Sequence, residues 1–149
     1  IELYIPPKKG KSHVLRIIRE LIEFQPKSFK TNISEALQFL SRVTKKKAIV
    51  FMLSDFMDKG YEKPIQIAAK KHDITGIRIY DKKETELPNL GYIIVNTSSA
   101  AVRKEYAKQY HEIVNYFETL WQKSGAGVVS CRNDESYTQK LLGYFKNRG

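Results

Sequence analysis

The stretch KAIVFMLSDFMDKG, residues 47–60, decides the fold. A continuous apolar run from Ala48 to Leu53 is followed by Ser54 and the carboxylate Asp55. The run is too short and too rich in β-formers for a helix, and continuous apolar character is typical of a strand buried on both faces of a parallel sheet. Sites in such sheets form beyond the carboxyl ends of the strands. We therefore expect Asp55 to lie at the edge of the sheet where a site would form.

Strand and helix patterns alternate along the rest of the chain. Strand patterns lie at residues 1–5, 48–53, 74–80, 92–96 and 127–131, and helical patterns at 12–24, 31–43, 63–72, 98–123 and 134–148. This alternation predicts an α/β fold with a parallel sheet covered by helices on both faces. No repeat, low-complexity tract or linker interrupts it, so we treat residues 1–149 as a single domain.

Several residues predict where helices begin and end. Ser12 is the expected N-cap of the first helix, and Asn32 with Glu35 resembles a capping box. His72 is expected at a helix C-terminus, where a cation suits the helix dipole. Gly125 is expected to end the longest helix. The first and last helices should each bury one apolar face, formed by Val14, Leu15, Ile18, Leu21 and Ile22 in the first and by Tyr137, Leu141, Leu142 and Phe145 in the last.

Composition narrows the function classes. The chain carries 26 Lys and Arg against 16 Asp and Glu, a formal charge of +10, which attracts anionic partners. The lysines are scattered over turns and element ends and no nucleic-acid motif accompanies them, so we expect a solvated surface. Electrostatic nucleic-acid binding without chemistry is a weaker alternative, and it predicts a steep loss of affinity with salt. A single cysteine, Cys131, excludes an internal disulfide and favours a reducing, cytoplasmic setting. No apolar run is long enough for a membrane span.

Common catalytic motifs are absent. PPKKGKSHV contains Gly-Lys-Ser, but Ile5 stands where a phosphate-binding loop needs its first glycine. The three histidines lack the paired spacing of a zinc site. Ser54 has no G-x-S-x-G context, and Cys131 has no evident base beside it.

Asp55 therefore carries the functional hypothesis, and three interpretations of it remain open. The carboxylate caps a turn or helix, acts as a general base, or helps to bind a hard cation such as Mg²⁺ through oxygen ligands. Thr31, in the loop just before a helix, is a second oxygen of the right type. Because Mg²⁺ keeps several waters, a few protein oxygens are enough to hold it.

The sequence resembles the bacterial domain-of-unknown-function family fifty-eight. The residues that carry the resemblance are IELYIPPKKGKSHVLRIIREL, TNISEALQFLSR, KAIVFMLSDFMDKGYEKPIQIAAKKHDITGIRIYDKKETELPNLG and NTSSAAVRKEY, which together cover nearly the whole chain. The resemblance implies a von Willebrand factor A-like domain, a Rossmann-like three-layer α/β/α fold with a mostly parallel sheet. Members of the family are often encoded beside MoxR-type AAA+ ATPases.

The resemblance also implies a metal-ion-dependent adhesion site built from three motifs. These are an Asp-x-Ser-x-Ser loop after the first strand, a later threonine, which Thr31 matches, and an aspartate after the fourth strand, which Asp55 matches. Such sites bind Mg²⁺ whose open position accepts a carboxylate from a partner protein. Function would then be adhesion or scaffolding without turnover.

Two departures from the family pattern qualify that expectation. Asp-x-Ser-x-Ser occurs nowhere in the chain, and its place in the family lies before Ile1, together with the first, central strand. We therefore expect a piece of a longer protein, with a partial metal site, no well-bound metal, and an exposed edge on the 48–53 strand that favours a dimer or exchanged strands. The segment between Gly91 and Thr97 is also shorter than the family's usual hairpin.

Two functions follow as hypotheses. The first is a non-enzymatic protein-interaction module whose partner is a MoxR-type ATPase or its clients, located in the cytoplasm or held at the inner membrane through segments upstream of Ile1. The alternative is a metal-dependent hydrolase or nuclease that uses Asp55 on a polyanionic substrate, which the basic charge favours. Asp58 is interpreted as a turn residue of the MDKG segment and not as a second catalytic group.

Overall fold

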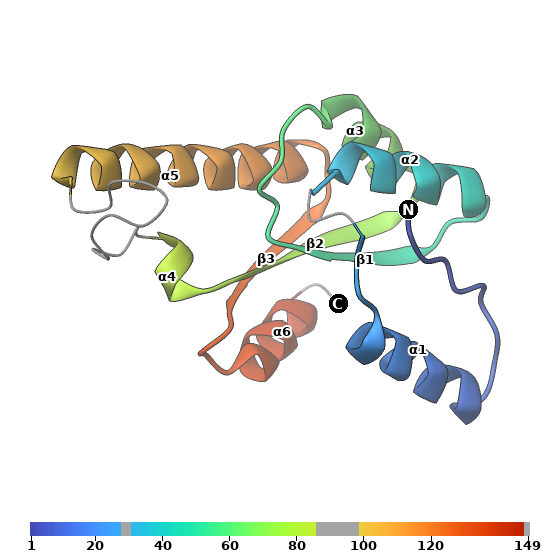
Figure 1. The fold of residues 1–149 in the computed structure, drawn as a ribbon. Helices are drawn as coiled ribbons and strands as arrows, with labels where there is room; N and C mark the ends of the chain where they lie inside the picture. The colour runs from blue at the N-terminus through green and yellow to red at the C-terminus, as the bar shows by residue number, and fades with distance from the viewer. Residues whose placement is uncertain (28–30, 86–98, 148–149) are drawn as a thin grey trace.

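The computed structural model describes residues 1–27, 31–85 and 99–147. Figure 1 shows the path of the chain through helices on both sides of a sheet. In chain order the elements are α1 (Lys11–Glu23), α2 (Ile33–Val43), β1 (Ile49–Ser54), α3 (Glu62–Lys71), β2 (Asp73–Tyr80), α4 (Lys82–Thr85), α5 (Ala100–Lys123), β3 (Gly127–Arg132) and α6 (Tyr137–Lys146).

The three described strands form an all-parallel sheet in the order β1-β2-β3. The register pairs Val50 with Ile74 and Ser54 with Arg78, so the carboxyl ends of β1 and β2 lie at the same edge. The predicted parallel sheet and its three matching strands are confirmed. The predicted strand at 92–96 lies outside the described residues.

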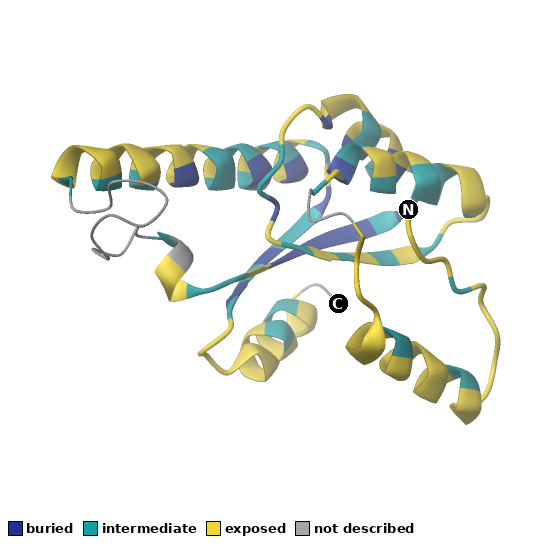
Figure 2. Cartoon of the chain, viewed as in Figure 1, coloured by how far each residue is buried: buried dark blue, intermediate teal, exposed yellow. Residues whose placement is uncertain are grey.

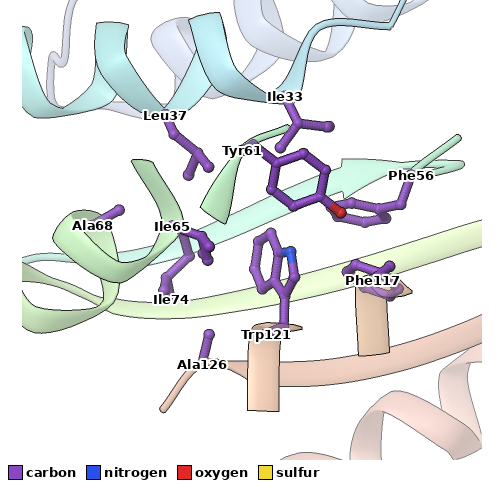
Figure 3. Packing of buried hydrophobic residues seen from close by; sticks show 10 residues of the cluster. All are labelled: Ile33, Leu37, Phe56, Tyr61, Ile65, Ala68, Ile74, Phe117, Trp121 and Ala126. Carbon is purple, nitrogen blue, oxygen red and sulfur yellow. The ribbon is translucent and has the colours of Figure 1, made fainter. Parts of the chain in front are cut away.

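One face of the sheet carries the main core, beneath α2, α3 and α5 (Figure 1). Side chains alternate along a strand, so Ile74 and Gly76 of β2 point to this face together with Val50 and Met52 of β1. The buried cluster, drawn in Figure 3, consists of Ile33, Leu37, Phe56, Tyr61, Ile65, Ala68, Ile74, Phe117, Trp121 and Ala126. This core joins the loop after β1 to α5, which matters for the site below.

The opposite face is only partly covered. Ile49, Phe51 and Leu53 point to that side and are 70%, 48% and 61% exposed. α6 packs on β3 through Leu141 and Tyr144 and reaches β1 through an edge-on contact of Phe145 with Phe51, which leaves most of the β1 side exposed (Figures 1 and 2). The prediction that this strand is buried on both faces is therefore wrong for the described chain, because β1 is an edge strand with α-helical cover on one side alone.

The predicted helices lie where the sequence places them, but two of them bury less of their apolar faces than expected. Asn32 caps α2 by accepting a hydrogen bond from the Glu35 amide, and α5 ends just before Gly125, whose φ of 78° suits glycine. The expected apolar faces of α1 and α6 are not buried, since neither helix contains a buried residue. Their periodicity identified helices correctly, but a pattern does not reveal whether a partner surface is present.

Three local predictions are corrected. Gly10 precedes α1 and no side chain caps it, so Ser12 is not the N-cap and lies within the helix. Residues 1–5 form no strand, because their alternating pattern finds no strand to pair with and Tyr4 instead packs edge-on against Phe39. The sequence patterns give no helix between residues 80 and 98, whereas the structure has the short helix α4 at Lys82–Thr85.

His72 ends α3 as predicted, but its side chain is buried. The side chain is 3% exposed and neither ring nitrogen finds a hydrogen-bond partner in the described chain. Burial, with the Lys71 charge, lowers the pKa of His72 below its usual 6.5. The residue is therefore neutral and does not act as the cation expected at this helix end.

This shift predicts a pH effect on stability. The unfolded chain binds a proton on His72 near pH 6.5 while the folded chain resists it, so the free energy of unfolding should fall as the pH drops below about 6.5. Urea unfolding from about pH 8 to about pH 5 measures the effect. His72→Leu should flatten the slope in that window, and an unchanged slope in the variant would assign the effect to other groups.

In the part of the chain that the structure describes, every helix is too short or too polar to cross a bilayer.

Candidate functional site

The candidate site lies at the carboxyl end of β1. Ser54 is the last residue of the strand, and Asp55 begins the loop that follows. The Ser54 hydroxyl donates to Asp55 Oδ1 at 3.2 Å and accepts from the Phe56 amide at 3.1 Å. Asp55 Oδ1 also accepts from the Met57 amide at 3.2 Å. These bonds fold the loop back on itself and hold the exposed Asp55 carboxylate at the rim of the sheet.

Phe56 fixes this loop to the core. Its backbone is left-handed, with φ of 57°, an unusual conformation for a large side chain that costs about 1 kcal/mol. The ring is 1% exposed, stacks on Phe117 with centroids 3.9 Å apart, and meets Trp121 edge-on at 5.2 Å. Burial of the ring offsets the backbone strain, so Phe56 is the anchor that sets the position of Asp55.

Thr31 lies beside the Asp55 carboxylate and comes from the segment that precedes α2. It precedes the Asn32 cap of α2, and its hydroxyl donates to Asp55 Oδ1 at 3.4 Å. The structure therefore brings the two residues that the sequence singled out, Thr31 and Asp55, to one position despite their separation along the chain. The hydroxyl of Ser54 makes a third oxygen at this edge.

Asp58 holds the two halves of the site together. Its Oδ2 accepts from the Ile33 amide at 2.7 Å, and its Oδ1 accepts from the Lys59 amide at 2.8 Å. The first bond satisfies a free amide in the first turn of α2, where a negative charge also suits the helix dipole. The interpretation of Asp58 as a turn residue is confirmed by its bond to the Lys59 amide. Its bond to the Ile33 amide of α2 is a second role, which the local sequence does not reveal.

Asp58→Ala should lower the free energy of unfolding by about 1–2 kcal/mol, because it leaves the amide at the start of α2 without its charged acceptor. Urea unfolding at neutral pH measures the loss. Asp58→Asn keeps one oxygen acceptor and should recover part of it. Equal stability of Asp58→Ala and the parent chain would show that water replaces the carboxylate without cost.

The chemistry of the donors fits a hard cation. One carboxylate and two hydroxyls are the oxygen ligands that Mg²⁺ accepts, and an exposed position leaves room for its waters. Within residues 1–27, 31–85 and 99–147, no group of three or more His, Cys, Asp or Glu side chains could hold a metal ion. Thr31, Ser54 and Asp55 therefore bring together oxygen atoms of the type that Mg²⁺ accepts, and a bound ion would need further oxygens.

The chain is thus an α/β protein with a parallel sheet, and a cluster of hydroxyl and carboxylate groups lies at the carboxyl edge of that sheet. The chain belongs to the family described as protein of unknown function DUF58, whose model matches residues 1–126. This confirms the family resemblance seen in the sequence. No solved structure gives a significant match.

The relatives found are described as uncharacterized proteins. The chain is 19% identical over 157 aligned residues to the uncharacterized protein MAV169 of Mycobacterium avium, covering 97% of this chain and 93% of that protein. It is 21% identical over 106 residues to the uncharacterized proteins Mb1516 of Mycobacterium bovis and Rv1480 of Mycobacterium tuberculosis. That match covers 69% of this chain and 33% of each relative, so the chain spans about a third of their length.

Proposed function

We propose that this chain is a non-enzymatic protein-interaction module of the von Willebrand factor A-like type, which binds its partner through a Mg²⁺ ion. The observation that supports the proposal is the meeting of the Thr31 hydroxyl and the Asp55 carboxylate at the carboxyl end of β1. This is the edge at which ligands bind in open parallel sheets.

In this proposal Thr31, Ser54 and Asp55 supply part of the coordination shell, and other groups supply the remaining oxygen ligands. Because Asp55 is exposed, a bound ion would keep a position open to solvent. A carboxylate from a partner protein would fill that position, since Mg²⁺ retains exchangeable waters. The proposed partner is a MoxR-type AAA+ ATPase or one of its clients, as the family resemblance implies.

The hydrolase alternative has less support. It needs a second acid or base beside Asp55, and the nearest acidic residue along the chain is Asp58. Both carboxylate oxygens of Asp58 accept backbone amides, which suits a structural role. Adhesion needs only that the ion be held and presented, and Thr31, Ser54 and Asp55 would supply part of the shell that holds it.

Partner binding tests the proposal. The longest native protein that contains residues 1–149 should retain a MoxR-type ATPase in a pull-down with Mg²⁺ and release it in EDTA. Asp55→Ala should abolish retention. Glu112→Ala, which removes an exposed carboxylate on α5, is the matched control and should bind normally. Retention that is equal for Asp55→Ala and the parent, or equal with and without Mg²⁺, would contradict the proposal.

A further inference from the structure

A groove of about 720 Å³ lies between α2 and α3 and is here called the helix groove. Its lining extends from Ser34 to Arg42 on α2 and from Gly60 to Ile67 on the α3 side. Figure 1 shows these two helices next to each other on the same face of the sheet. The helix groove is therefore a surface feature of the helices that cover the main core.

Hydrogen bonds fix the two helices to each other at both ends of the helix groove. At one end Asp58, in the loop before α3, accepts from the Ile33 amide of α2. At the other end the Lys71 ammonium donates to the carbonyl oxygens of Ser41 and Thr44 at 3.4 and 2.7 Å. The two walls cannot separate without breaking these bonds, so the helix groove is preformed.

The helix groove begins beside the candidate site. Its lining starts with Ser34, in the first turn of α2, and with Gly60, in the loop that carries Asp55. From there it follows α2 to Arg42 in the last turn, about 12 Å of helix beyond Ser34. An extended chain covers that distance in about four residues. A peptide that contacts the candidate site can therefore continue along the helix groove.

Two exposed cations line the helix groove, Arg42 on α2 and Lys63 on α3. Within the parts of the chain that the structure describes, neither side chain forms an ion pair. Glu62 also belongs to the lining, but its carboxylate accepts a hydrogen bond from the Tyr116 hydroxyl of α5 at 2.7 Å. Two cations against one carboxylate that already has a partner make the helix groove a favourable place for anionic groups.

The apolar part of the lining is small and lies over a finished core. Ile67 is 59% exposed on the α3 wall, whereas Leu37, Ile65 and Ala68 of the two helices are fully buried. A small apolar area with a polar and charged rim is typical of an interface with a separate molecule. The bare apolar face of β1 lacks such a rim of cations, so the helix groove is better suited to a partner than to a missing layer of the same fold.

We infer that the helix groove binds an acidic peptide segment of a partner protein, in which carboxylates flank an apolar side chain. The carboxylates contact Arg42 and Lys63, and the apolar side chain packs on Ile67. This inference rests on the proposed function, because the segment continues from the carboxylate that the metal ion accepts. The formal charge of +10 draws such a segment toward the chain before contact.

Fluorescence anisotropy with a fluorescein-labelled peptide, in which two glutamates stand on each side of one leucine, tests the inference on the 149-residue chain. The parent should bind the peptide, and Arg42→Glu and Lys63→Glu should each raise the Kd by at least about fivefold. Arg19→Glu on α1 and Lys108→Glu on α5 are matched controls, because they reverse exposed cations outside the lining. Each control should change the Kd by less than about twofold, and circular dichroism checks that every variant is folded.

The titration is run in EDTA, so its outcome does not depend on the metal site and the two proposals fail separately. No binding by the parent would overturn the inference, and so would an equal loss in all four variants, which would assign binding to net charge alone. Acetylation of Lys63, followed by mass spectrometry, should be as fast in the longest native protein that contains residues 1–149 as in the 149-residue chain. Slower acetylation in the native protein without peptide would also overturn the inference, by showing that another segment of the same protein covers the helix groove.

Discussion

Trp121→Ala is expected to lower the free energy of unfolding by about 3–5 kcal/mol, the range for emptying a buried aromatic position. Trp121 is fully buried in the middle of the main core, between α5 and the sheet. It contacts Phe117 at a centroid distance of 5.5 Å and Phe56 at 5.2 Å. Its removal leaves a cavity under the loop that carries Asp55, so the loss should reach the site as well as the core.

Urea unfolding followed by circular dichroism measures this loss, since the variant has no tryptophan left to report by fluorescence. Tyr106→Ala is the control on the same helix, because Tyr106 is 36% exposed and should cost much less. If both substitutions cost the same, the cluster around Trp121 would not be the core that holds the fold together.

Gly76→Val is expected to cost about 3 kcal/mol, because β2 passes directly under the aromatic rings of α5. A Cβ at Gly76 would lie 2.9 Å from Trp121 Cζ3, closer than real contacts allow, and 3.0 Å from Phe117 Cε2, which is tighter than most. The rings belong to a filled core and cannot withdraw without shifting α5.

Gly143 provides a matched substitution that should raise the free energy of unfolding, whereas Gly76→Val should lower it. A Cβ at Gly143, in the exposed α6 helix, meets nothing within 4 Å, so Gly143→Ala should stabilise the chain by about 0.5–1 kcal/mol. Thermal unfolding of both variants measures the two effects. A neutral Gly76→Val would mean that α5 packs less closely on β2 than the structure shows.

The sequence predicted the strands because their signals are local. Continuous apolar runs bounded by turn residues placed β1, β2 and β3 within one or two residues, and parallel pairing follows from the alternation with helices. The meeting of Thr31 and Asp55 was also expected, because the family resemblance matches them to two ligand positions of one metal site. The structure adds that a hydrogen bond joins them.

The features that sequence reasoning missed depend on long-range contacts. The left-handed backbone of Phe56 is stable only because Phe117 and Trp121, far along the chain, bury its ring. The bond from the Ile33 amide to Asp58 joins two loops that no local motif connects. The exposure of the apolar face of α1 could not be predicted either, because helical periodicity indicates that an apolar face exists and does not indicate which surface covers it.

The measurement that tests the central claim most directly is a thermal-shift titration with Mg²⁺ and Mn²⁺. It compares the longest native protein that contains residues 1–149, its Asp55→Ala variant, and the 149-residue chain. Binding raises Tm in step with RT ln(1 + [L]/Kd). The account predicts a rise in the native protein that Asp55→Ala abolishes and that is weak in the shorter chain, where the shell is incomplete. No rise in the native protein, or an equal rise in Asp55→Ala, would contradict a metal site at this edge.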